Sequence, residues 1–108
     1  MRFELHSNSG LKITKSMRNY ISEAQKKLEK VLTEDALVIG TCQVENEMRG
    51  YEITIYSKIG TITVEDYSRD FYHSVDNTVR KMEDTLRKSR KRRITQKRRK
   101  MKKAKLRA

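Results

Sequence analysis

The sequence predicts an α+β fold, in which a four-stranded mixed sheet carries two helices on one face in the order β-α-β-β-β-α. A basic C-terminal tail follows and can extend the last helix. Apolar residues alternate in four short segments and recur at helical spacing in two longer ones. A helix between the first two strands implies a right-handed parallel crossover, whereas the later, short connections imply antiparallel hairpins. With 108 residues the chain has room for one small domain.

One strand and one helix are predicted in the first third of the chain. Residues Arg2–His6 alternate, with Phe3 and Leu5 on one face, as is typical of a strand. Thr14 is a candidate N-cap for a helix of about 15–20 residues. The apolar face of this helix consists of Met17, Tyr20, Ile21, Ala24, Leu28, Val31 and Leu32.

Three further strands are predicted over Leu37–Val44, Tyr51–Tyr56 and Thr61–Glu65. Gly40 predicts a β-bulge in the first of them, because glycine inside a strand often marks one. The connections Glu47–Gly50 and Lys58–Gly60 are short enough for hairpins.

A second helix is predicted to begin near Ser68. Its apolar stripe consists of Phe71, Tyr72, Val75, Val79, Met82 and Leu86. No glycine or proline follows Gly60, so nothing in the sequence forces this helix to stop at Leu86. Ile94 and Met101 are isolated and cannot continue the buried stripe.

Charge divides the chain into two parts. The formal net charge is +12, yet residues 1–86 carry 12 basic and 14 acidic side chains. Residues 87–108 carry 14 basic side chains and no acidic ones. We therefore predict a folded domain over residues 1–92 and a basic tail over residues 93–108.

Catalytic and metal-binding chemistry has little support. His6 and His73 have no neighbouring ligand at a recognisable metal spacing, so both are expected at the surface or its boundary. Cys42 is expected in or beside the core, without an identifiable base partner. We predict no enzymatic activity, no cofactor and no metal. A single cysteine, no signal peptide and no apolar run of membrane length favour a soluble cytoplasmic protein.

Basic side chains carry a stronger signal. At 100° per residue, those projecting away from the apolar faces are Lys15, Arg18, Lys26 and Lys30 on the first helix and Arg80, Lys81, Arg87, Lys88 and Lys91 on the second. If both helices cover one face of the sheet, these cations share one outer surface that would neutralise phosphates. A solvated helix face explains the first-helix cations equally well. The tail favours a nucleic acid over a membrane, because it lacks an aromatic or leucine face.

Several stretches resemble the ribosome hibernation-promoting factor family, also described as ribosome-associated translation inhibitors. They are residues 11–21 leading into 27–30, residues 51–55, and residues 64–66, 70–72, 75–76, 80–82 and 86–88. The resemblance covers about residues 1–92. It implies a protein that binds the small ribosomal subunit across the decoding region, where its basic helices lie on ribosomal RNA and obstruct messenger and transfer RNA.

By position, the resemblance implies RNA contacts from basic residues of both helices. With the outward-facing Arg80 and the tail, the predicted rRNA-binding set is Arg18, Lys27, Lys30, Arg80, Lys81, Arg87, Lys88, Arg90, Lys91, Arg92, Arg93, Lys97, Arg98 and Arg99. The chain departs from the family at Asp84, where a basic residue is common. It also lacks the dimerisation domain of long members, so we expect a monomer that does not pair ribosomes by itself.

The function predicted is therefore ribosome hibernation: inhibition of translation by steric occlusion of the small subunit, under stress or in stationary phase. A constitutive rRNA-binding component of the ribosome is the nearest alternative, because basic extensions suit such proteins equally well. A double-stranded-RNA-binding domain and a small ferredoxin-like enzyme are more distant alternatives.

Overall fold

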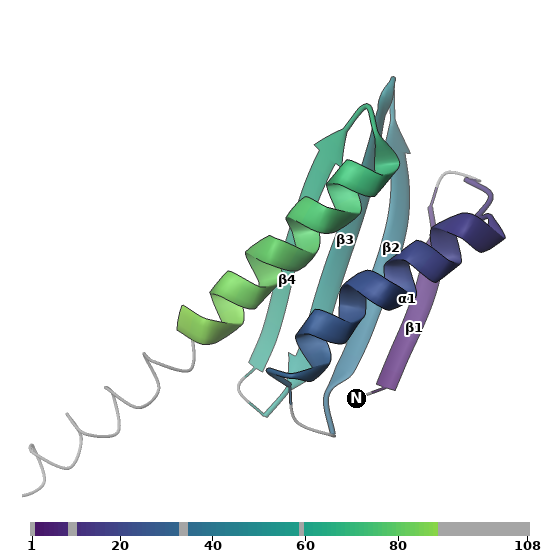
Figure 1. Ribbon diagram of the computed structural model, residues 1–108. Coiled ribbons are helices and arrows are strands. Elements are labelled where there is room, and N and C mark those ends of the chain that lie inside the picture. The colour runs from purple at the N-terminus through teal and green to yellow at the C-terminus, as the bar shows by residue number, and fades with distance from the viewer. Residues whose placement is uncertain (1, 9–10, 33–34, 59, 89–108) are drawn as a thin grey trace, which may run out of the picture.

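The computed structural model describes residues 2–8, 11–32, 35–58 and 60–88 (Figure 1). Its elements are β1 (Arg2–Ser7), α1 (Lys15–Glu29), β2 (Leu37–Glu45), β3 (Met48–Ser57) and β4 (Gly60–Ser68), followed by a second helix over residues 71–88. The predicted order β-α-β-β-β-α is confirmed. No helix in these ranges is both long enough and apolar enough to cross a membrane.

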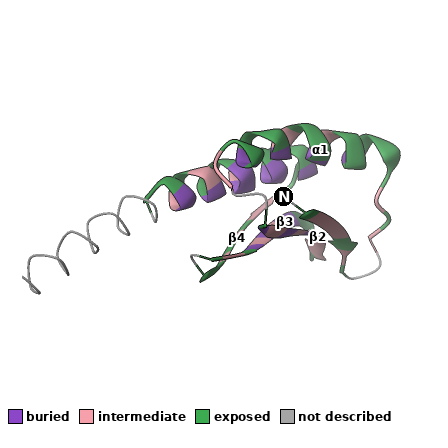
Figure 2. Ribbon diagram, turned by 90° about the horizontal axis from the view of Figure 1, so that it is seen from below, coloured by how far each residue is buried: buried purple, intermediate pink, exposed green. Residues whose placement is uncertain are grey.

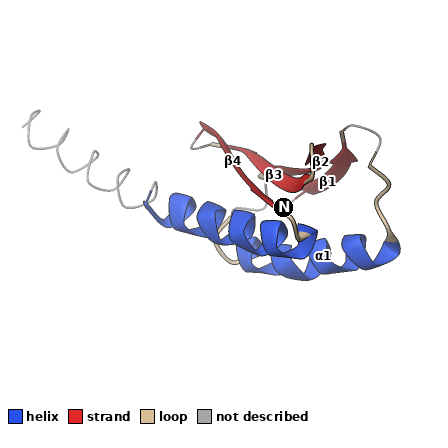
Figure 3. Cartoon of the chain, turned by 90° about the horizontal axis from the view of Figure 1, so that it is seen from above, coloured by secondary structure: helices blue, strands red, loops and turns tan. Residues whose placement is uncertain are grey.

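The sheet has the strand order β1-β2-β3-β4. β1 pairs in parallel with β2, whereas β2, β3 and β4 pair antiparallel. Both helices cover the same face of the sheet and leave the other face open (Figure 3). The α+β class and the mixed sheet are therefore confirmed. Each helix runs antiparallel to the strand before it. Since β1 and β4 point the same way, the two helices also run in the same direction (Figure 1).

The first helix begins where its sequence predicts. The Oγ1 atom of Thr14 accepts a hydrogen bond from the Met17 backbone N–H at 3.1 Å, which satisfies one of the free donors of the first turn. Met17, Ile21 and Leu28 are buried against the sheet. Figure 2 shows this division along both helices, with buried residues toward the strands and exposed residues outward.

The second helix begins three residues later than predicted. β4 continues to Ser68, which pairs with Arg49, and the helix starts at Phe71. Asp70 caps it, since its Oδ1 atom accepts a hydrogen bond from the Tyr72 N–H at 3.1 Å. The prediction of a start near Ser68 was wrong because strand pairing holds that residue. Leu86 is buried, so the apolar stripe reaches as far as predicted.

Gly40 does not form the predicted bulge. β2 and β3 pair without interruption from Leu37 to Glu45. A Cβ atom added at Gly40 would lie 2.1 Å from the hydroxyl oxygen of Tyr51, which leans across the glycine from the next strand. The glycine therefore makes room for a buried ring instead of an extra residue in the strand.

The first hairpin is tighter than predicted. Glu45 pairs with Met48, so only Asn46 and Glu47 lie in the turn, and residues 48–50 belong to β3. Asn46 adopts a φ of 55°, a left-handed conformation that asparagine tolerates better than most residues. The predicted connection over Glu47–Gly50 was therefore displaced by about one residue at its start and three at its end. In the second hairpin Ser57 pairs with Gly60, so Gly60, which was predicted in the connection, belongs to β4.

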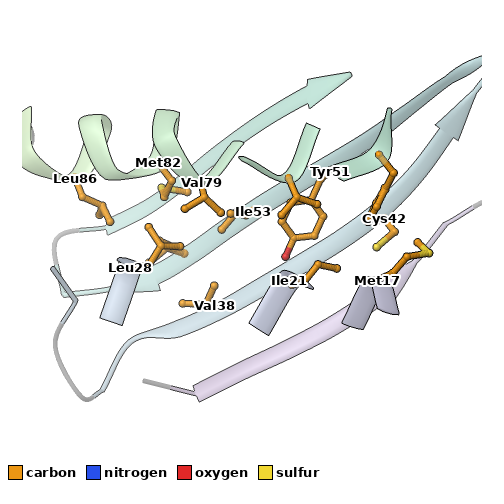
Figure 4. Close-up of a cluster of buried hydrophobic side chains, with 13 residues drawn as sticks. Met17, Ile21, Leu28, Val38, Cys42, Tyr51, Ile53, Val79, Met82 and Leu86 are labelled. Carbon is orange, nitrogen blue, oxygen red and sulfur yellow. The ribbon is translucent and has the colours of Figure 1, made fainter. Parts of the chain in front are cut away.

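The core lies between the helices and the sheet (Figure 4). Its side chains come from α1, β2, β3 and the second helix, and the largest is Tyr51, which is fully buried. The Tyr51 hydroxyl oxygen accepts a hydrogen bond from Gln25 Nε2 at 3.2 Å, and this bond satisfies two buried polar groups. Cys42 also lies here, as predicted. Burial raises the pKa of its thiol to about 11, although the charge of Arg18 acts in the opposite direction.

Candidate nucleic-acid interface

Five of the predicted RNA-binding side chains are exposed cations on the helical layer. Within the ranges that the structure describes, none of them has an ion-pair partner: Arg18, Lys27, Lys30, Arg80 and Lys88. No acidic side chain among the described residues therefore pairs with these charges. Exposed lysine and arginine side chains of this kind can contact phosphates without a large desolvation penalty.

Two other predicted contacts already have acidic partners. Lys81 Nζ lies 2.9 Å from Asp66 Oδ1 and also donates to the backbone oxygen of Glu65 at 3.4 Å. Arg87 pairs with Glu83 one turn before it, at 3.3 Å. Lys81 is exposed, as its predicted position away from the apolar stripe implies, but it leans toward β4 at the edge of the sheet and already has an acidic partner. The sequence did not predict this ion pair, because Asp66 lies 15 residues before Lys81.

Asp66 is the acidic centre of this edge contact. Burial alone would raise the pKa of its carboxyl. Hydrogen bonds from Lys81 and Asn77, together with the charge of Lys81, outweigh burial and lower that pKa. The carboxylate is therefore charged at neutral pH and holds the second helix against β4.

Tyr20 and Asp76 join the two helices at their surface. The Tyr20 hydroxyl donates to Asp76 Oδ2 at 2.7 Å, and the rings of Tyr20 and Tyr72 meet edge to face with centroids 4.8 Å apart. The hydrogen bond that Asp76 accepts from Tyr20, burial, and the charges of Asp76 and Asp70 raise the pKa of Tyr20. This hydrogen bond was not predicted, because Tyr20 and Asp76 are 56 residues apart and nothing in the sequence pairs them.

The helix contact sets which cations lie near one another. Tyr20 lies opposite the first turns of the second helix, so the later turns of the two parallel helices also lie side by side (Figure 1). Lys27 and Lys30 thus lie on the same end of the helical layer as Arg80 and Lys88. Arg18 is separated from them, because it precedes Lys27 by about 14 Å along the helix axis.

The remaining candidates from the sequence are the two histidines and the predicted contacts near the C-terminus. His6 and His73 are both exposed, as predicted, and His6 Nε2 lies 3.5 Å from the carboxylate of Glu4. Among the described residues, no group of three or more His, Cys, Asp or Glu side chains is arranged to hold a metal ion. Seven predicted contacts lie outside the described residues, as does the predicted boundary after residue 92: Arg90, Lys91, Arg92, Arg93, Lys97, Arg98 and Arg99.

The structure thus defines a small α+β domain, in which two parallel helices with exposed cations cover one face of a four-stranded mixed sheet. The chain belongs to the Sigma 54 modulation protein / S30EA ribosomal protein family, whose family model matches residues 6–94. This membership confirms the resemblance drawn from the sequence.

Individual relatives agree with that family. The chain is 34% identical over 91 residues to the ribosome hibernation promotion factor of Staphylococcus aureus (strain COL), a match covering 82% of this chain. The match covers 47% of that relative, so the chain spans about half its length.

Two solved structures share the fold. The N-terminal domain of Protein Y from Thermus thermophilus superposes with a TM-score of 0.72 at 19% identity, covering 82% of this chain and 98% of that one. A ribosomal subunit interface protein from Coxiella burnetii gives a TM-score of 0.70 at 19% identity, covering 83% and 98% of the two chains.

Proposed function

We propose that this chain is a ribosome hibernation factor that binds the small ribosomal subunit across the decoding region. In this position the folded domain would obstruct the sites of messenger and transfer RNA. The chain would act as a monomer in the cytoplasm and without chemistry of its own. Inhibition would follow from steric occlusion. Contacts between the cations of the helical layer and phosphates would hold the domain in this position.

The observation that carries this proposal is the set of exposed cations on that layer that have no acidic partner in the described part of the chain. Each phosphate neutralised by such a cation releases counterions, which favours binding at low salt. Family membership supports a ribosomal partner. Similarity to a ribosome hibernation promotion factor of Staphylococcus aureus and to a ribosomal subunit interface protein of Coxiella burnetii supports hibernation at a subunit interface.

The sharpest test reverses two of these charges. We expect R80E/K88E to weaken binding to purified vacant small subunits and to flatten the log–log dependence of affinity on salt by about 1–2, since each phosphate contact contributes about 0.7–0.9. The matched control is R2E/K58E, which changes net charge equally. It alters Arg2 in β1 and Lys58 in the second hairpin turn, both of which have acidic partners. Equal weakening by both variants would show that net charge matters and the helical layer does not.

Sedimentation separates hibernation from the alternative of a constitutive ribosomal component. In sucrose gradients of a lysate, a hibernation factor is expected with small subunits and vacant ribosomes and absent from polysomes. A constitutive component would be found in polysomes at constant stoichiometry and would resist a high-salt wash. Equal occupancy of polysomes would therefore contradict the proposal.

A further inference from the structure

Tyr72, Asp76 and Arg80 form a line of exposed side chains along the second helix. They are spaced four residues apart, so each lies about 6 Å beyond the last along the helix axis and only 40° around it. The line thus presents an aromatic ring, a carboxylate and a guanidinium in sequence on the outer side of the helical layer.

The ring of Tyr72 is unusual for its exposure. With 37% of its surface accessible, it is among the few exposed large hydrophobic side chains of the described residues. Its orientation is nevertheless set, because it meets Tyr20 edge to face at an interplanar angle of 77° and contacts Phe71 in the same manner. An exposed aromatic ring held in one orientation is suited to stacking on an unpaired nucleobase.

The two neighbours of the ring suit the rest of a nucleotide. Asp76 uses Oδ2 to accept the bond from Tyr20, and a carboxylate has further capacity to accept. Arg80 has no hydrogen bond or ion pair with any residue that the structure describes, so its guanidinium is free for a phosphate. Acidic Asp76 disfavours a phosphate at the middle of the line and favours a neutral hydroxyl donor there.

We propose that Tyr72, Asp76 and Arg80 form a subsite for one unpaired ribonucleotide, with the base stacked on Tyr72, the ribose 2′-hydroxyl donating to Asp76, and a flanking phosphate on Arg80. The inference rests on the proposed function for its RNA partner and adds to it a preference for single-stranded RNA. The other unpaired cations of the layer supply phosphate contacts that carry no such preference.

The test compares three labelled oligonucleotides with the full-length chain by fluorescence anisotropy at fixed salt. One is an unstructured RNA, one is its 2′-deoxy counterpart, and one is the same RNA backbone with abasic residues. Stacking contributes about 1–3 kcal/mol per base, so the wild-type chain should bind the RNA at least about fivefold more tightly than the abasic backbone. No preference for the base-bearing RNA would overturn the proposal without any variant.

Variants then locate the preference. Y72L should weaken RNA binding about fivefold or more yet leave abasic binding unchanged, whereas Y72F keeps the ring and should bind normally. Y56L is the matched control, since Tyr56 is also exposed, at 45%, but lies on the open face of the sheet. D76N should reduce the preference for RNA over its deoxy counterpart. Equal losses in Y72L and Y56L, or equal losses on RNA and abasic backbone, would overturn the proposal.

This assay contains no ribosome, so its outcome is separate from that of the sedimentation experiments. A chain that fails to bind small subunits can still show the nucleotide preference. Conversely, a Y72L chain that cosediments normally and binds RNA normally would refute the subsite and leave the proposed function intact.

Discussion

At the scale of single residues, acidic partners distant in sequence decide which basic side chains are already ion-paired. Lys81 and Arg80 are neighbours in the chain, yet Lys81 is paired with Asp66 and Arg80 has no described partner. The difference follows from the direction of each side chain, since 100° of rotation turns one toward β4 and the other outward. Whether a basic side chain has an acidic partner is thus a property of the packed helix, which the sequence alone does not show.

The Asp66 contact gives a prediction with a defined pH dependence. Because the folded-state pKa of Asp66 lies below its ordinary value of 3.8, its contribution to stability is present above about pH 4 and is lost as pH falls through the folded-state value. We expect D66N to lower the free energy of unfolding at pH 7 by about 0.5–1 kcal/mol, given the exposure of Lys81. Urea unfolding at pH 7 and pH 2.5 measures this, and the difference between wild type and variant should shrink at the lower pH.

Tyr20 gives a second prediction at this scale. Y20F removes the hydroxyl that donates to Asp76 and keeps the ring contact with Tyr72. We expect a loss of about 0.5–1.5 kcal/mol in the free energy of unfolding at neutral pH. Y56F, which alters an exposed tyrosine of the open face, should leave stability unchanged. Equal unfolding midpoints for Y20F and wild type would mean that the bond between the helices contributes nothing.

At the scale of elements, the pairing of β2 and β3 depends on fitting a large ring over a glycine. The ring and hydroxyl of Tyr51 occupy the space that a side chain at Gly40 would need, and α1 covers this ring from above through Gln25. The strand, its neighbour and the helix therefore depend on one another at this point. A glycine in a strand here reflects a close approach across strands, which sequence alone cannot distinguish from a bulge.

We therefore expect G40A to be strongly destabilising for so small a change. The added methyl group would overlap a buried ring, and overpacking of this kind costs about 1–3 kcal/mol. Y51F removes the atom nearest the new Cβ, so G40A/Y51F should lose less stability than the sum of the two single variants. Chemical denaturation of all four chains gives the coupling energy. Strict additivity would mean that the strands shift to relieve the overlap.

At the scale of the whole molecule, the excess positive charge is concentrated in the C-terminal residues of the sequence. Residues 94–108 carry eight basic side chains and no acidic ones. Among the described residues, Leu86 is the last buried apolar side chain of the second helix. We therefore propose that the folded part supplies the shape and that these basic residues supply much of the non-specific affinity.

Deleting residues 94–108 should therefore separate affinity from folding. We expect the thermal unfolding midpoint to stay within a few degrees of wild type, while binding to vacant small subunits weakens and depends less steeply on salt. Circular dichroism and binding at several salt concentrations measure the two effects. An unfolded deletion variant would show that Ile94 and Met101 belong to the core, contrary to the boundary inferred here.

The sequence by itself determined the fold class, the order of the elements and most of the core, because hydrophobic periodicity and capping are local properties of a chain. It also indicated that basic residues gather on the helices and beyond them. Tertiary structure decided the rest: that Gly40 accommodates Tyr51, that Ser68 stays in β4, and that Tyr20 meets Asp76. Each of these depends on two segments brought together by packing. Packing likewise decided that Lys81 pairs with Asp66, because helical periodicity predicts that Lys81 is exposed but does not show which acidic residue it meets.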